Sequence, residues 1–151
     1  MASIQKTLTV TNGAYTIGDA VGGLITFTDL TSYFAKWASN SALVVSLKLA
    51  GVVAIPYDLW FMNANLATPA ADNAAFTLVV ADEPKVLGVV PIAATDYKAG
   101  PAAFNVATVR NIGLDIQPAA GATAIYAYLV ATEVTSPGTT TIYLTLDFEA
   151  S

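Results

Sequence analysis

TIYLTLDFEA (residues 141–150) is the stretch that decides the fold class. Every second residue is a large apolar one, and the positions between them carry polar residues and Tyr143; the apolar set is Ile142, Leu144, Leu146 and Phe148. A period of two is typical of a β-strand that buries one face in a core and turns the other outward. The stretch therefore predicts a half-buried strand late in the chain.

The same alternation recurs along the rest of the sequence. Turn signals separate the alternating segments, among them Asn12-Gly13, Gly100-Pro101 and Ser136-Pro137-Gly138. About six to eight strands divided by turns predict an all-β fold, either an antiparallel β-sandwich or a jelly-roll-like fold. The further predicted strands are residues 45–49, 57–62, 76–80, 106–112 and 124–131.

Residues 29–38 break this period. Here the spacing i, i+3, i+4, i+7 places apolar side chains on one helix face, after Asp29 as a candidate cap; these side chains are Leu30, Tyr33, Phe34 and Trp37. We therefore expect one short helix or loop insertion around 29–38. Two roles for its aromatic residues stay open, because they can close one end of the sandwich or face a partner.

The chain length fits one domain, since 151 residues are enough to bury a substantial core. Residues 1–14 are Thr-rich and extended in character, and they are expected to form an edge strand or an arm that reaches a neighbouring subunit. Residues 15–151 are expected to form a single β-sandwich domain. The first residues lack the basic and then apolar pattern of a secretory signal, which predicts synthesis in the cytoplasm.

Composition points to assembly. The chain is 55% apolar and 11% charged, whereas soluble domains average about 45–50% and about 25%. This imbalance predicts that part of the surface is covered by other subunits. No run of about 20 apolar residues is present, so no membrane partner is expected. A net charge of −5 with 6 basic residues argues against nucleic acid as a partner.

Catalytic chemistry has few candidates in this sequence. Without histidine and cysteine, disulfides, thiolate ligands and the commonest general bases are absent. The 11 carboxylates show no spacing that singles out a pair or a calcium loop. We therefore expect no enzyme activity, no cofactor and no metal site.

Aromatic residues are the candidate contact residues. Trp60 falls on the same strand face as Asp58, and Tyr143 lies opposite the core face of its strand. Outward aromatic side chains anchor protein interfaces or sugar-binding platforms. A second core face is the third alternative that stays open. The predicted interface residues are Tyr33, Phe34, Trp37, Trp60, Tyr126, Tyr128 and Tyr143.

Five short stretches between residues 17 and 148 also carry a likeness to known proteins. They are GDAVGGLITF (18–27), YDLWF (57–61), DNAAF (72–76), LGVV (87–90) and AIYAYLV (124–130). In this order and spacing they resemble the capsid decoration, or cement, proteins of tailed bacteriophages. The matched stretches are turns and strands rather than reactive residues.

This resemblance implies a structural virion protein, a β-rich subunit on the capsid exterior that ties neighbouring capsomers together without covalent bonds. Its expected partners are the major capsid protein and copies of itself, as a homotrimer or a dimer, after synthesis in the host cytoplasm. Two alternatives stay open. One is a carbohydrate- or host-surface-binding module of a fibre or tail, and the other is a tail or head-completion structural protein.

Overall fold

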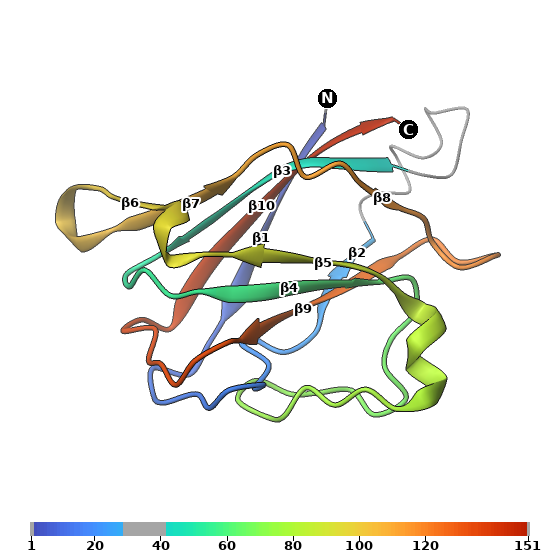
Figure 1. The fold of residues 1–151 in the computed structure, drawn as a ribbon, viewed down its shortest axis with the longest axis horizontal. Coiled ribbons are helices and arrows are strands. Elements are labelled where there is room, and N and C mark those ends of the chain that lie inside the picture. The colour runs from blue at the N-terminus through green and yellow to red at the C-terminus, as the bar shows by residue number, and fades with distance from the viewer. Residues whose placement is uncertain (1, 29–41, 151) are drawn as a thin grey trace.

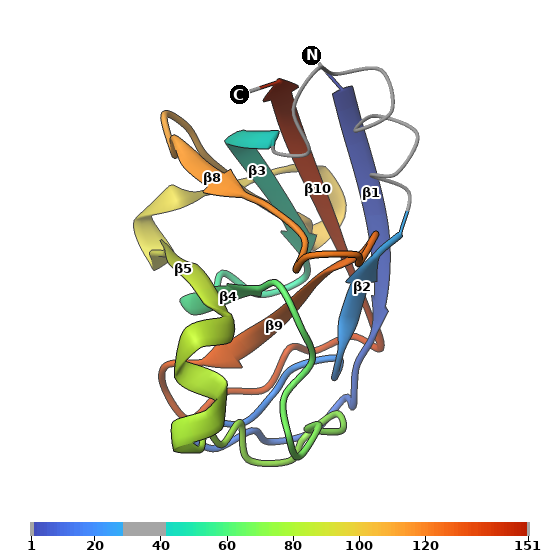
Figure 2. The same cartoon turned by 90° about the vertical axis from the view of Figure 1, so that its right-hand side faces the viewer.

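The computed structural model describes residues 2–28 and 42–150, which form two antiparallel sheets that face one another (Figures 1 and 2). In the larger sheet the strand order is β1-β10-β3-β7-β6, and β8 also pairs with β3. In the smaller sheet the order is β2-β9-β4-β5. The helix or loop insertion expected around 29–38, with Tyr33, Phe34 and Trp37, lies outside the described residues.

The larger sheet contains β1 (Ala2–Thr9), β3 (Ala42–Gly51), β6 (Tyr97–Ala99), β7 (Asn105–Val109), β8 (Leu114–Ile116) and β10 (Thr141–Ala150). The smaller sheet contains β2 (Ile25–Phe27), β4 (Tyr57–Met62), β5 (Val86–Ile92) and β9 (Ile125–Ala131). Short 3₁₀ turns in the described chain are η1 (Val80–Lys85), η2 (Ala94–Asp96) and η3 (Pro101–Ala103).

The strand pairs are nested along the chain. The first strand, β1, pairs with the last, β10; β2 pairs with β9; β3 pairs with β7 and β8; and β4 pairs with β5. A double sheet wound in this way is a jelly roll. The predicted all-β class, an antiparallel sandwich of jelly-roll type, is therefore confirmed.

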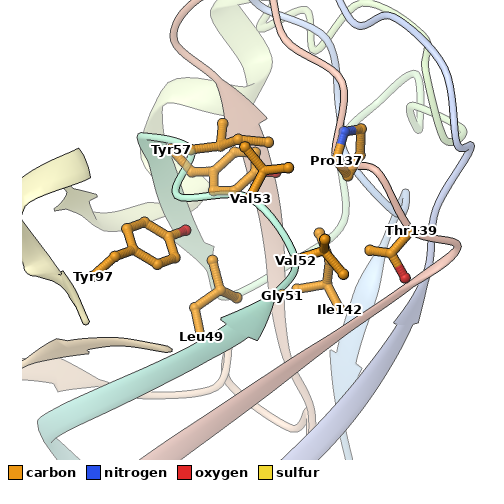
Figure 3. A pocket seen from close by; sticks show the side chains of 10 residues that line it. Leu49, Gly51, Val52, Val53, Tyr57, Tyr97, Pro137, Thr139 and Ile142 are labelled. Carbon is orange, nitrogen blue, oxygen red and sulfur yellow. The ribbon is translucent and has the colours of Figure 1, made fainter. Parts of the chain in front are cut away.

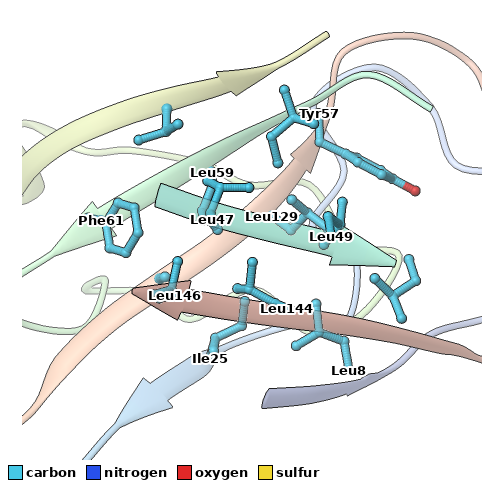
Figure 4. Packing of buried hydrophobic residues seen from close by; sticks show 14 of the residues in the cluster. Leu8, Ile25, Leu47, Leu49, Tyr57, Leu59, Phe61, Leu129, Leu144 and Leu146 are labelled. Carbon is cyan, nitrogen blue, oxygen red and sulfur yellow. The ribbon is translucent and has the colours of Figure 1, made fainter. Parts of the chain in front are cut away.

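β10 shows why the alternating sequence folds as it does. Its four alternating apolar side chains are at most 3% exposed, and the residues between them, from Tyr143 to Asp147, point away from the second sheet. The core lies between the sheets, where leucines of β3 and β10 meet side chains of β4 and β9 (Figure 4). Burying a side chain of this size contributes about 1.5–3 kcal/mol, so the inner faces stabilise both sheets together.

The N-terminal segment belongs to this sandwich. β1 lies at the edge of the larger sheet, and Ile4 and Leu8 are buried in the common core. Ala2 pairs with Phe148, so the two ends of the chain lie close together (Figure 1). Of the two forms expected for residues 1–14, the structure has the edge strand, and it contributes to the same core as the rest of the chain.

Two of the predicted strands need correction. Residues 76–79 pair with no described strand, and Val80 begins η1, so the strand predicted at 76–80 is wrong. Its alternation has another cause, because Phe76 and Leu78 pack against the outside of the smaller sheet. The strand predicted at 106–112 ends at Val109, before Asn111 with its φ of 57°.

Among the described residues, no helix has the length and apolar character needed to cross a membrane.

The two sheets approach closely at Gly88. A Cβ atom at Gly88 would lie 2.6 Å from Cδ1 of Leu114, a residue of the other sheet. We expect Gly88→Ala to lower the free energy of unfolding by about 1–3 kcal/mol through overpacking. Urea unfolding measures this change.

Gly51→Ala is the matched control, because its Cβ would meet nothing closer than 3.9 Å. Neither glycine has a positive φ, so backbone strain does not enter the comparison. Equal stabilities for the two variants would contradict the close approach at Gly88.

Candidate binding surface

The outer face of the smaller sheet carries a second apolar layer. β4 and β5 are neighbours in the sheet, yet residues 63–85 connect them by a long excursion that folds back over it (Figure 1). Residues 18–20 run beside this excursion, with hydrogen bonds from Phe76 N to Gly18 O and from Ala20 N to Ala74 O. Long ordered connections of this kind in a compact domain are usually functional.

A buried carboxylate, Asp82, joins the first part of the excursion to its end. Its oxygens accept hydrogen bonds from Lys85 Nζ (2.9 Å), Ala67 N (2.9 Å) and Val79 N (3.1 Å). The Lys85 hydrogen bond and then the two backbone amides lower the pKa of Asp82 to about 2. Asp82 therefore stays ionised and holds η1 in place.

A second carboxylate, Asp72, joins the excursion to residues 11–22, which are 50–61 residues away in the sequence. Its Oδ2 accepts from Thr11 N (2.9 Å) and Thr11 Oγ1 (2.6 Å). Its Oδ1 accepts from the Tyr15 hydroxyl and from Gly22 N, both at 2.7 Å. Burial, and then the hydrogen bond to Asp72, raise the pKa of Tyr15 to about 12. Asp72 thus fixes the segment that runs beside the excursion.

Between these parts the structure leaves an open hollow of about 420 Å³, which we call the Trp60 hollow. Its lining residues are Ile17, Gly18, Asp58, Trp60, Phe76, Leu78, Val130, Ala131 and Thr132. The Phe76 ring lies 5.3 Å from the Trp60 ring and 5.2 Å from the Tyr128 ring, tilted at 50° and 47°. The hollow therefore has an aromatic wall, while Ile17 on its rim is 69% exposed.

The four described interface candidates lie in different environments. Trp60 lines the hollow and is part-buried, and Tyr126 is part-buried against the second apolar cluster. Tyr143 lies on the larger sheet and is 37% exposed. Tyr128 is fully buried and its hydroxyl donates to Asn65 Oδ1 at 2.9 Å. The expectation that Tyr128 faces a partner is therefore wrong, because the excursion covers it.

Two residues of the hollow have no signal in the sequence. Phe76 is placed there by the path of the excursion, and Ile17 by the segment that Asp72 fixes. Asp58 is different, because its strand face is shared with Trp60 and this is visible in the alternation of residues 57–62. The sequence could thus predict the pair on β4, but not the wall built over it.

A smaller cavity opens at one end of the sandwich (Figure 3). Leu49, Tyr57 and Tyr97 line one side and Pro137 and Thr139 the other. Its volume is about 10 Å³, which is room for about one water molecule. This cavity is too small for a ligand, so the Trp60 hollow is the stronger candidate site.

Within residues 2–28 and 42–150, no group of three acidic residues is placed to hold a metal ion. Comparisons with protein-family models, with curated proteins and with solved structures find no significant match to the chain.

Asp72 gives a pH-dependent contribution to stability. Burial alone would raise the pKa of Asp72, but hydrogen bonds from Thr11, Tyr15 and Gly22 outweigh burial and lower the pKa below its usual value. A lowered folded-state pKa stabilises the fold above the unfolded pKa of about 3.9, and this contribution is lost as the pH falls through the folded value. We expect Asp72→Asn to cost about 1–3 kcal/mol at pH 7, since an amide nitrogen would face two donors.

Urea unfolding of the unaltered chain and of Asp72→Asn between pH 7 and pH 2.5 measures the difference in their free energies of unfolding. It should shrink as the pH falls below about 4. Asp115→Asn, at an exposed carboxylate on β8, is the control and should change little. A difference that is independent of pH would show that the Asp72 charge is not what stabilises these segments.

Proposed function

We propose that this chain is a structural virion protein of the capsid decoration, or cement, class. It would bind the outside of the major capsid lattice and stabilise it by non-covalent contacts. The Trp60 hollow is the observation that carries the proposal, because it is an open, aromatic-lined site whose surrounding segments are held by the hydrogen bonds of Asp72 and Asp82. Such sites are typical anchors of protein interfaces.

The jelly roll supports the proposal at the level of the fold. Jelly rolls recur in viral capsid proteins, but they also occur in lectins. A fold by itself does not fix a function. The resemblance of residues 17–148 to the phage decoration family favours the capsid, and the low charge of 11% suits a subunit whose surface is partly covered.

A cement subunit needs contact area rather than chemistry. Specific protein contacts bury about 1,200–2,000 Å², and many modest contacts on one closed shell add up through multivalency. Exposed apolar side chains outside the core can contribute, such as Ile17 (69% exposed), Val80 (82%) and Val134 (69%). In this proposal the chain works on the capsid exterior as a homotrimer or dimer, after synthesis in the host cytoplasm.

One observation favours a second candidate, a carbohydrate- or host-surface-binding module. Trp60, Phe76 and Asp58 line the same hollow, and an aromatic ring beside a carboxylate is able to bind a sugar ring. Copy number separates the two functions, because cement proteins cover the lattice whereas fibre or tail modules are few.

Quantitative gel densitometry of purified virions tests the proposal first. We expect the chain in a near-stoichiometric ratio to the major capsid protein, as lattice-wide binding requires. A handful of copies per particle would favour a tail, fibre or head-completion role. Absence from the particle would overturn the virion assignment.

The contact surface can be tested with particles assembled without the chain. We expect Trp60→Ala to weaken binding to these particles by about 30-fold or more, as loss of an interface anchor worth about 2 kcal/mol does. Tyr143→Ala tests the exposed interface candidate on the opposite sheet, and it should leave binding unchanged if the hollow makes the contact. Loss of binding with Tyr143→Ala alone would place the contact on the larger sheet and refute the role of the hollow.

A further inference from the structure

We propose that the Trp60 hollow receives an arginine side chain of a partner protein, with Asp58 as its counter-ion and Trp60 as its apolar wall. The inference deepens the proposed function. It rests on that function only in naming the protein that carries the arginine, which is a coat protein of the particle. The site itself is defined by the residues of this chain.

The carboxylate of Asp58 is the first reason. Several described carboxylates form no hydrogen bond or ion pair with any residue that the structure describes; they are Asp58, Glu83, Asp115, Glu133 and Glu149. All of them are exposed except Asp58, which is part-buried. An ionised group that is partly removed from water gains most from a partner of opposite charge.

The neighbours of Asp58 on the sheet favour an ion pair with such a partner. On the outer face of the smaller sheet it pairs with Pro91 of β5 and Val130 of β9, both apolar. Trp60 follows on the same face of β4, about 7 Å along the strand. Because Asp58 is part-buried, a charge pair formed here is screened by water and salt less than a pair on a fully exposed surface.

The charges around the hollow also favour a cation as its occupant. No lysine or arginine is among its lining residues. Its neighbours in sequence, Asp19 beside Gly18 and Glu133 beside Thr132, are acidic, and the chain carries a net charge of −5. The hollow is therefore complementary to a cation, and its aromatic wall suits a cation that is weakly hydrated.

Arginine fits better than lysine or a sugar. The guanidinium group is planar, stacks on aromatic rings and pairs with a carboxylate in a bidentate manner, whereas an ammonium group is compact and strongly hydrated. A sugar needs several converging polar groups. Thr132 adds little here, since its hydroxyl already donates to Pro56 O at 3.1 Å.

The test follows the indole N–H signal of Trp60 by ¹⁵N–¹H NMR, assigned by comparison with Trp37→Phe. The probes are the peptide acetyl-Ala-Arg-Ala-Arg-Ala-amide and the same peptide with citrulline, which keeps the shape of arginine without its charge. We expect saturable shifts with the arginine peptide and affinity at least about tenfold weaker with citrulline, because the charge pair is lost.

Asp58→Asn should weaken arginine-peptide binding by a similar factor. Asp115→Asn makes the same charge change at an exposed carboxylate of the larger sheet and should leave the affinity unchanged. If Asp58→Asn failed to fold, the citrulline peptide would still show, on the unaltered chain, whether binding needs the charge of arginine. Equal binding of both peptides, equal losses in both variants, or no saturation at millimolar peptide would each overturn the proposal.

Other occupants give different results. Saturation by methyl glucoside but not by the arginine peptide would make the hollow a sugar site. Oligomers that dissociate on Asp58→Asn in sedimentation runs would make a second copy the occupant. Peptide binding without binding to particles would overturn the proposed function and leave the arginine site intact. Particle binding that Asp58→Asn does not change would overturn the arginine site and leave the proposed function intact.

Discussion

The apolar contact between the inner faces of the two sheets is the interaction on which the rest of the molecule depends. β10 lies between β1 and β3 in one sheet, and its buried side chains meet those of β4 and β9 in the other. Because the strand pairs are nested, the pairing of the first strand with the last closes the sandwich. The loops of the described chain therefore rest on a core to which both ends of the chain contribute.

The candidate site depends on this core indirectly, through the excursion that packs on the outer face of the smaller sheet. Residues 63–85 rest on the outer face of β4 and β9, and Asp72 and Asp82 fasten them with short hydrogen bonds. Asp82 accepts the amide protons of Ala67 and Val79, which an excursion without regular pairing would otherwise leave unsatisfied, and Asp72 accepts those of Thr11 and Gly22 in the neighbouring segment. Two buried or part-buried charges thus hold the segments that surround the Trp60 hollow.

The two outer faces of the sandwich have opposite character. On the larger sheet, the row formed by Gln5, Thr145, Lys48 and Thr108 crosses four strands and is polar. On the smaller sheet, β9 is buried on both faces along most of its length. Part of the apolar excess that suggests assembly is therefore used within the chain itself. Of the side chains that remain for a partner, Ile17 lines the Trp60 hollow beside Trp60 and Phe76, whereas others, such as Val53, Phe104 and Tyr143, lie elsewhere on the surface.

The sequence by itself determined the all-β class, the inner face of β10 and the sharing of one strand face by Asp58 and Trp60, because alternation along a strand is a local property. It could not separate a packed excursion from a strand at residues 76–80, since both alternate. Only the tertiary structure decided that Tyr128 is covered while Trp60 stays accessible. Exposure of an outer sheet face depends on which distant segments fold over it, and those contacts leave no periodic pattern in the chain.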